Sequence, residues 1–153
     1  MENVKEVKFR KITDNRGALT PLQYPDDIPF EIKRVYYIYD VQEGVERGFH
    51  SHKNLEQILI ALGGNIKVRT KTPYEEKVFL LDNPSKGLYI GPYIWREMFD
   101  FSPNSTLLVL ASHEYDENDY FRDYNEYEKE YKLTRKSKGM MKLNENKNSN
   151  FNK

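Results

Sequence analysis

Cysteine is absent from this 153-residue chain. Its absence excludes disulfide bonds, thiolate metal sites and thiol nucleophiles. A net charge is also lacking, because 24 Lys and Arg residues balance 24 Asp and Glu residues, so we expect no bulk binding to nucleic acid or to an acidic membrane. No apolar run approaches the ~18 residues of a membrane span, and the first residues, MENVKEVKFRK, lack a signal-peptide core. We expect a soluble, cytoplasmic protein.

Proline and glycine are scarce in the last third of the chain. All seven prolines precede residue 104, and seven of the eight glycines precede Pro92. Between these turn residues stand short runs rich in Val, Ile, Tyr and Phe, which are typical of strands joined by tight loops. We expect strands at 7–12, 18–23, 32–39, 47–51, 56–62, 65–70, 76–81, 87–90, 96–101 and 106–112. This spacing predicts an all-β fold closed as a jelly roll, which hides its sheet edges.

The C-terminal part has a different character. The stretch DENDYFRDYNEYEKEYK contains neither Pro nor Gly and places tyrosines at positions 120, 124, 127 and 131. These intervals of four, three and four are helical spacing with one apolar face, so we expect a short helix packed on the barrel. Lys, Asn, Ser and Gly then dominate. We predict one domain, residues 1–132, followed by a polar tail, residues 133–153, that is disordered.

Two histidines stand at the centre of the most distinctive motif. His50 and His52 are two residues apart in a segment that reads as a strand, so their imidazoles share one face. In full the spacing is Gly44, five residues, His50-x-His52, three residues, Glu56, six residues, Gly63. This stretch resembles the first sequence motif of the cupin superfamily at every fixed position. The resemblance implies a cupin jelly-roll barrel.

Three interpretations fit this histidine pair. The first is a metal site, but the second-motif region, GLYIGPYIWREM, holds Arg96 where a further His is expected, and His113 lies beyond the last strand. An arginine repels a divalent cation, so we predict no metal. The second is acid–base chemistry, since imidazole titrates close to neutral pH. The third is a structural role, although burying two imidazoles only to fill space is costly. We favour acid–base chemistry.

Four longer stretches carry a more specific resemblance. IPFEIKRVYYIYDV (28–41), RGFHSHKNLEQILIALGGNIKV (47–68), GLYIGPYIWREMFDFS (87–102) and LVLASHEYDENDYFRDYNEY (108–127) are similar to the sugar 3,4-ketoisomerases, WxcM-like cupins that act on dTDP-4-keto-6-deoxyglucose. The similarity covers most of residues 5–131. It implies conversion of a 4-ketone into a 3-ketone on the route to 3-amino-3,6-dideoxy sugars of surface glycans such as lipopolysaccharide or S-layer glycan. It also implies a homodimer with exchanged N-terminal strands, and neither a metal nor another cofactor.

The resemblance assigns the catalytic pair to His50 and His52, and the spacing leaves open which of them takes the proton from C3. Tyr36 is the expected third acid–base or oxygen-contacting group, although strand alternation also admits Tyr37.

Several cations surround the pair. We expect Arg16, Arg47, Lys53 and Arg96 to hold the diphosphate or the sugar, because guanidinium forks match phosphate oxygens. Trp95 is the expected support for the thymine. The combination of Arg16 with Arg96 leaves the C4 configuration of the product, galacto or gluco, open. Two alternatives also stay open: a dTDP-sugar 3,5-epimerase, and a non-catalytic cupin that binds a nucleotide sugar.

Overall fold

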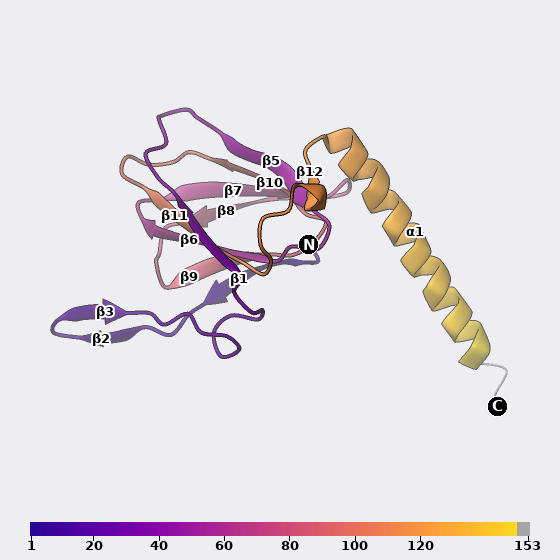
Figure 1. The fold of residues 1–153 in the computed structure, drawn as a ribbon, viewed down its shortest axis with the longest axis horizontal. Helices are drawn as coiled ribbons and strands as arrows, with labels where there is room; N and C mark the ends of the chain where they lie inside the picture. The colour runs from indigo at the N-terminus through magenta and orange to yellow at the C-terminus, as the bar shows by residue number, and fades with distance from the viewer. Residues whose placement is uncertain (150–153) are drawn as a thin grey trace.

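The computed structural model describes residues 1–149 as a two-sheet β-barrel with a hairpin and a helix projecting from it (Figure 1). The first sheet has the order β1-β9-β6-β11-β4 and the second β12-β5-β10-β7-β8, and all pairs are antiparallel. The first sheet comprises β1 (Val4–Lys8), β9 (Lys86–Ile90), β6 (Gln57–Gly63), β11 (Thr106–Ala111) and β4 (Arg34–Ile38). The second comprises β12 (Tyr120–Phe121), β5 (Arg47–His52), β10 (Trp95–Phe99), β7 (Ile66–Lys71) and β8 (Glu76–Leu81). This is the predicted jelly roll.

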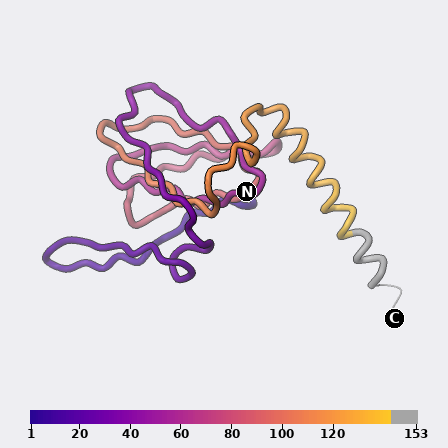
Figure 2. The backbone as a smooth tube through the Cα atoms, viewed as in Figure 1, coloured from indigo at the N-terminus to yellow at the C-terminus, as the bar shows by residue number. Residues whose placement is uncertain are grey.

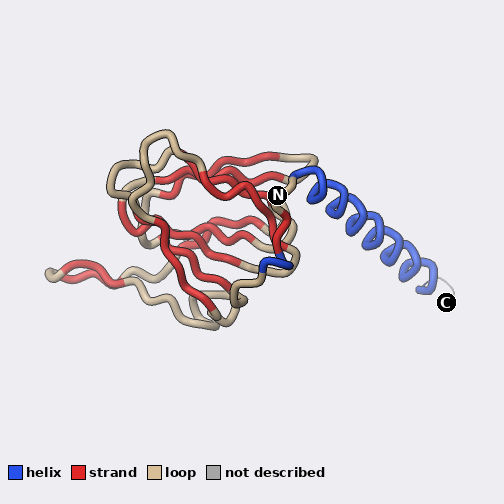
Figure 3. Tube along the Cα trace, turned by 45° about the horizontal axis from the view of Figure 1, so that its top comes forward, coloured by secondary structure: helices blue, strands red, loops and turns tan. Residues whose placement is uncertain are grey.

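The apolar core lies between the two sheets, which face each other across the interior in Figure 3. Alternation along each strand decides which side chains enter it. On β6, Leu59 and Ala61 point into the barrel, whereas Ile58 and Ile60 pack outside it against the segment around Ile28. Both faces of β6 are therefore apolar and buried, which accounts for its unbroken apolar run.

A separate hairpin leaves the barrel near the N-terminus. It pairs β2 (Ile12–Asp14) with β3 (Gly17–Leu19), and every residue in both strands is exposed. The sequence predicted two strands here, at 7–12 and 18–23; the first instead divides between β1 and β2. Figure 2 shows the hairpin extending away from the body of the molecule.

Helix α1 (Tyr124–Ser149) follows a single 3-10 turn, η1 (Glu117–Asp119). Asp123 begins the helix by accepting a hydrogen bond from the backbone N–H of Glu126 at 2.9 Å. The first two turns pack on the barrel, where Tyr127 and Tyr131 join Trp95 and Phe121 in a buried cluster, and Arg135 of a later turn pairs with Glu2 at 2.6 Å. None of the helices in the described residues has the length and apolar content needed to cross a membrane.

The helix is much longer than the sequence suggested. It runs through most of residues 133–153, the segment expected to be a disordered tail, and only 150–153 lie outside the described residues. That segment contains no proline and one glycine, and its Lys, Arg, Leu and Met residues are good helix formers. Composition alone does not separate such a polar helix from a disordered tail.

Candidate active site

The histidine pair lies at a bulge in β5. Gly48 and Phe49 both have positive φ angles, of 92° and 57°, and the register between β5 and β10 shifts at this point. A Cβ atom at residue 48 would lie 2.9 Å from the carbonyl oxygen of Arg96, so only glycine allows the strands to approach this closely. The bulge sets His50 opposite Arg96 and leaves Phe49 exposed.

The two imidazoles face each other inside the barrel. Their ring centroids are 4.9 Å apart and their planes nearly perpendicular. His52 is fully buried, and neither of its ring nitrogens has a hydrogen-bond partner among the described residues. No hydrogen bond among the described residues therefore fixes which ring nitrogen of His52 carries the proton.

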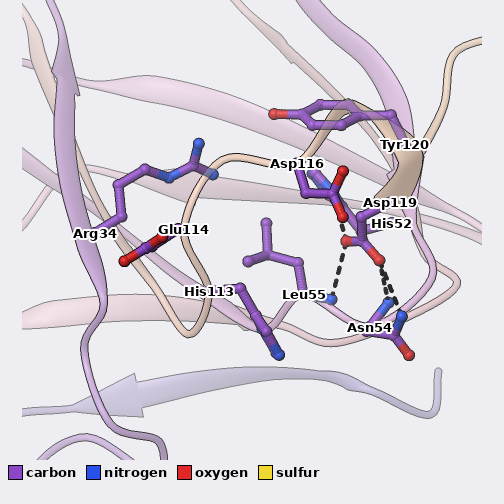
Figure 4. Close-up of a pocket in the computed structure, with 9 residues that line it drawn as sticks. All are labelled: Arg34, His52, Asn54, Leu55, His113, Glu114, Asp116, Asp119 and Tyr120. Atoms are coloured by element: carbon purple, nitrogen blue, oxygen red, sulfur yellow. Dashed lines mark hydrogen bonds and ion pairs between the residues drawn. The ribbon is translucent and has the colours of Figure 1, made fainter.

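The segment that follows the last long strand closes one side of this pair. Tyr120 of β12 pairs with His52 in the sheet, and its ring centroid lies 4.2 Å from that of His52 and 5.1 Å from that of His50. Asp119 Oδ2 lies 3.3 Å from His52 Nδ1. The Asp119 carboxylate is held in place by the backbone N–H groups of Asn54 and Leu55, at 2.8 and 3.2 Å (Figure 4).

A chain of hydrogen bonds crosses the interior beside the histidines. Arg96, only 1% exposed, donates from Nη1 to Gln57 Oε1 at 2.6 Å, and Gln57 Nε2 contacts the Tyr36 hydroxyl at 3.0 Å. The remaining bonds of the guanidinium go to the carbonyl oxygen of Ile94. In the described part of the chain no carboxylate lies within ion-pair distance of Arg96, and its hydrogen-bond acceptors, Gln57 and the Ile94 carbonyl, are neutral.

Burial and the Arg96 charge together keep both imidazoles neutral. Burial, reinforced by the nearby guanidinium, lowers the pKa of His50 to about 3 and lowers that of His52 as well. The pKa of His52 is lowered even though the Asp119 carboxylate, which would favour the protonated ring, lies 3.3 Å away. Burial also lowers the pKa of Arg96 to about 10, which still leaves the guanidinium charged at neutral pH, and raises that of Tyr36. The site therefore combines the buried Arg96 cation with two neutral imidazoles and the Tyr36 phenol, and the Asp119 carboxylate lies beside His52.

A small cavity of about 140 Å³ reaches one member of this group, His52 (Figure 4). Arg34 lies on one side of it and His52, Asp119 and Tyr120 on the other. The Arg34 guanidinium carbon stands 5.3 Å from the ring centroid of Tyr36. The lining of the cavity therefore combines the Arg34 cation and His52 with the carboxylates of Glu114, Asp116 and Asp119.

The structure brings together four of the residues expected from the sequence: His50, His52, Tyr36 and Arg96. Strand alternation, which left Tyr36 and Tyr37 as alternatives, is resolved by β4, because the Tyr36 hydroxyl reaches Gln57 while Tyr37 is 62% exposed.

The other expected residues lie elsewhere in the protomer. Arg16 is in the turn of the β2–β3 hairpin, paired with Asp14. Arg47 is exposed at the start of β5. Lys53 directs its ammonium to the carbonyl oxygen of Asn118 at 3.1 Å. Trp95 is on the opposite face of β10 from Arg96, buried beneath α1 among tyrosines of the helix, so the structure does not bring it to the histidines.

The glutamate of the motif also faces away. Glu56 accepts a hydrogen bond from the Tyr89 hydroxyl at 2.7 Å, on the outer side of the sheet. Within the described residues, no three His, Asp or Glu side chains gather closely enough to hold a metal ion.

Sequence reasoning missed three residues of the site. Gln57 directly follows the motif's glutamate and was passed over, although its alternation with Leu59 marks it as inward-facing. Asp119 and Tyr120 were assigned to the helical stretch, but the helix begins only at Tyr124. No local signal separates Tyr120 from the regular tyrosine spacing of the helix.

Comparison with known proteins gives consistent results. The family model FdtA (WxcM-like, C-terminal) matches residues 2–132. A TDP-4-oxo-6-deoxy-α-D-glucose-3,4-oxoisomerase of Aneurinibacillus thermoaerophilus is 47% identical over 129 residues, covering 84% of this chain and 92% of that protein. The 3,4-ketoisomerase QdtA of Thermoanaerobacterium thermosaccharolyticum, solved as a histidine-to-asparagine mutant in complex with TDP-4-keto-6-deoxyglucose, is 54% identical with a TM-score of 0.85, covering 87% and 96% of the two chains. The WlaRB TDP-quinovose 3,4-ketoisomerase of Campylobacter jejuni is 45% identical with a TM-score of 0.81, covering 84% and 99%.

Proposed function

The chain belongs to the FdtA (WxcM-like, C-terminal) family and is a dTDP-sugar 3,4-ketoisomerase, and we propose that it converts dTDP-4-keto-6-deoxyglucose into a dTDP-3-keto-6-deoxyhexose by metal-free acid–base catalysis. The observation that carries this proposal is the interior group of two neutral imidazoles, one phenol and one buried guanidinium that has no carboxylate partner among the described residues. Each reaction step needs one of these groups.

The proposed reaction moves hydrogen between neighbouring carbons. The C4 ketone acidifies the C3 hydrogen, and one imidazole removes it as a proton. The C–H electrons then form the C3–C4 double bond of an enediolate, and negative charge develops on O4. Transfer of the O3 proton to O4 and return of a proton to C4 complete the shift, so the ketone ends at C3, O4 becomes a hydroxyl, and no atom is gained or lost overall. His50 and His52 divide these transfers between them, and Tyr36 serves the sugar oxygens.

Arg96 supplies the electrostatic part of this mechanism. A guanidinium in a water-excluded interior stabilises a developing oxyanion far better than it would in water. Without substrate the same charge, together with burial, suppresses protonation of His50 and His52. When negative charge appears on the substrate, that suppression is offset, and the imidazole becomes a stronger base as the reaction proceeds.

Binding of the nucleotide is the task we assign to the cations nearer the surface. Arg47 at the start of β5 and Lys53 directly after its end flank the histidine pair in the sequence, and Arg34 borders the cavity. Planar guanidinium groups suit diphosphate oxygens, and binding energy from the nucleotide then serves to position the sugar.

We further propose a homodimer in which the N-terminal hairpin is exchanged. Ile12 and Leu19 are 58% and 59% exposed on a hairpin that extends from the barrel (Figure 1). Exposed apolar side chains of this kind are typical of a surface buried by a partner. In such a dimer, Arg16 in the hairpin turn would reach the second protomer rather than its own histidines. We also propose, independently of the oligomeric state, that the 3-keto product is used in the cytoplasm for the synthesis of 3-amino-3,6-dideoxy sugars.

Proton NMR of the product made from dTDP-4-keto-6-deoxyglucose tests the proposed reaction. We expect a ketone at C3 and a new C4 hydrogen whose coupling gives the galacto or gluco configuration. A sugar that keeps its C4 ketone but is inverted at C3 and C5 would identify a 3,5-epimerase. Binding without any change of the sugar would identify a non-catalytic protein.

A further inference from the structure

Gln57 occupies a central place in the site that no part of the proposed chemistry uses. It is 2% exposed and lies on β6, between Arg96 of β10 and Tyr36 of β4. Its side-chain amide contacts both, at 2.6 Å from Arg96 Nη1 and 3.0 Å from the Tyr36 hydroxyl. It thus joins the two groups that contact the sugar oxygens in the proposed reaction.

The chemistry of the partners fixes the direction of both hydrogen bonds. A guanidinium only donates, so the amide must turn its oxygen toward Arg96 and its NH₂ toward Tyr36. The opposite amide orientation would set two donors against each other at 2.6 Å. Because an amide nitrogen only donates, the Tyr36 oxygen must accept, and the phenolic hydrogen is left to point elsewhere.

We propose that Gln57 is a positioning residue that makes Tyr36 a hydrogen-bond donor to the sugar oxygen that gains negative charge. The inference rests on the proposed ketoisomerase function. Arg96 fixes the orientation of the Gln57 side-chain amide by donating to its oxygen. The amide NH₂ then donates to the phenol oxygen of Tyr36, which leaves the phenolic hydrogen free to be donated to the substrate. Burial keeps this phenol protonated, since it raises the pKa of Tyr36.

The neutral charge of Gln57 is the second part of its role. A carboxylate in this place would pair with Arg96, the cation that otherwise has only neutral acceptors in the described structure. It would also accept the Tyr36 hydrogen and so turn the phenol away from the sugar. Glutamine is the side chain of this length that satisfies both neighbours while leaving the guanidinium charge and the phenolic proton available.

Four variants test this inference by steady-state kinetics on dTDP-4-keto-6-deoxyglucose. Tyr36→Phe removes the donor, and we expect kcat to fall about 10²-fold. In Gln57→Glu, kcat should fall at least as far, whereas KM should stay within about threefold of the parent value because ground-state binding is unchanged. Gln57→Met keeps the size of the side chain without its hydrogen bonds or a buried charge, so it tests the same point should the Glu variant fail to fold. Glu56→Gln, the adjacent outward-facing position, is the matched control and should keep full kcat.

A double-variant cycle separates positioning from simple packing. Once Phe replaces Tyr36, adding Gln57→Met should lower kcat by no more than about threefold, because the donor that Gln57 orients is already gone. Losses that multiply, or a Gln57→Met enzyme with the parent kcat, would overturn the inference while leaving the ketoisomerase function in place. A parent enzyme that makes no 3-keto product would overturn both.

Discussion

Arg96 stands opposite His50 in the register between β10 and β5, so that a buried cation and a half-buried imidazole share one interior. Without substrate this arrangement is electrostatically unfavourable for a protonated ring, because the Arg96 charge disfavours protonation of His50. The pairing suits a site in which a substrate develops negative charge between them. The pH dependence of the enzyme follows from this relationship.

The first prediction concerns the acid limb of catalysis. His50 has its pKa lowered to about 3 and His52 has its pKa lowered too, so both bases stay free well below the usual imidazole range. We expect kcat/KM, which reports groups of the free enzyme, to stay level from about pH 8 to about pH 5.5. A pH–rate profile checks this. An inflection near pH 6.5 would show that a histidine with ordinary proton affinity controls the reaction.

The same pKa shifts make folding stability depend on pH. In the unfolded chain both histidines titrate near 6.5, so below that pH the unfolded state binds more protons and stability falls as pH falls toward the lowered folded-state values. Between pH 7.5 and pH 5, each imidazole should cost about 2 kcal/mol of unfolding free energy. Urea unfolding at the two pH values measures this loss. The double variant His50→Asn, His52→Asn should lose about 4 kcal/mol less unfolding free energy than the parent over this interval. An equal loss in the parent and the double variant would show that these rings do not stay neutral.

Trp95 should contribute to stability rather than to substrate binding. It is 4% exposed, its indole N–H donates to Glu97 at 3.2 Å, and its ring packs 5.2 Å from Tyr124 and 5.7 Å from Tyr127. Trp95→Ala should lower the unfolding free energy by ~3–5 kcal/mol. In Trp95→Phe, which retains most of the packing, the dissociation constant of TDP measured by calorimetry should match that of the parent. A tenfold loss of TDP affinity in this variant would instead support contact with the nucleotide.

The exchanged hairpin predicts a defined oligomer. Replacing Ile12 and Leu19 by Asp places charges on the apolar side chains that the partner would bury, so the double variant should run as a monomer in light scattering after gel filtration. Val78→Asp, at an exposed position on edge strand β8, is the control and should stay dimeric. A monomeric parent chain would contradict the proposed dimer with exchanged hairpins.

The barrel could be predicted from the sequence because its strands are short, apolar and separated by strong turn residues. The segment 76–81 was placed with its exact bounds, and the neighbouring strands differ by one or two residues. Alternation within β4 could not choose between Tyr36 and Tyr37, since both are aromatic and both suit a strand. Tertiary contact with Gln57 makes that choice.

The residues around the histidine pair were harder to predict. Asp119 and Tyr120 are 67 and 68 positions from His52 along the chain, and only the pairing of β12 with β5 brings them together. The length of α1 was hidden for a different reason. Beyond Tyr131 the sequence has few apolar residues, so the apolar stripe by which helices are recognised does not continue to the end of α1.

One measurement tests most directly whether two imidazoles move the sugar hydrogen without a metal ion. The reaction is run in deuterated water with protein treated exhaustively with a chelator, and the product is read by proton NMR. We predict deuterium at C4, none at C5, full turnover after chelation, and a loss of turnover of ~10²–10⁴ in His50→Asn and in His52→Asn. Deuterium at C5, activity that returns only with added metal, or full activity in both variants would contradict the mechanism.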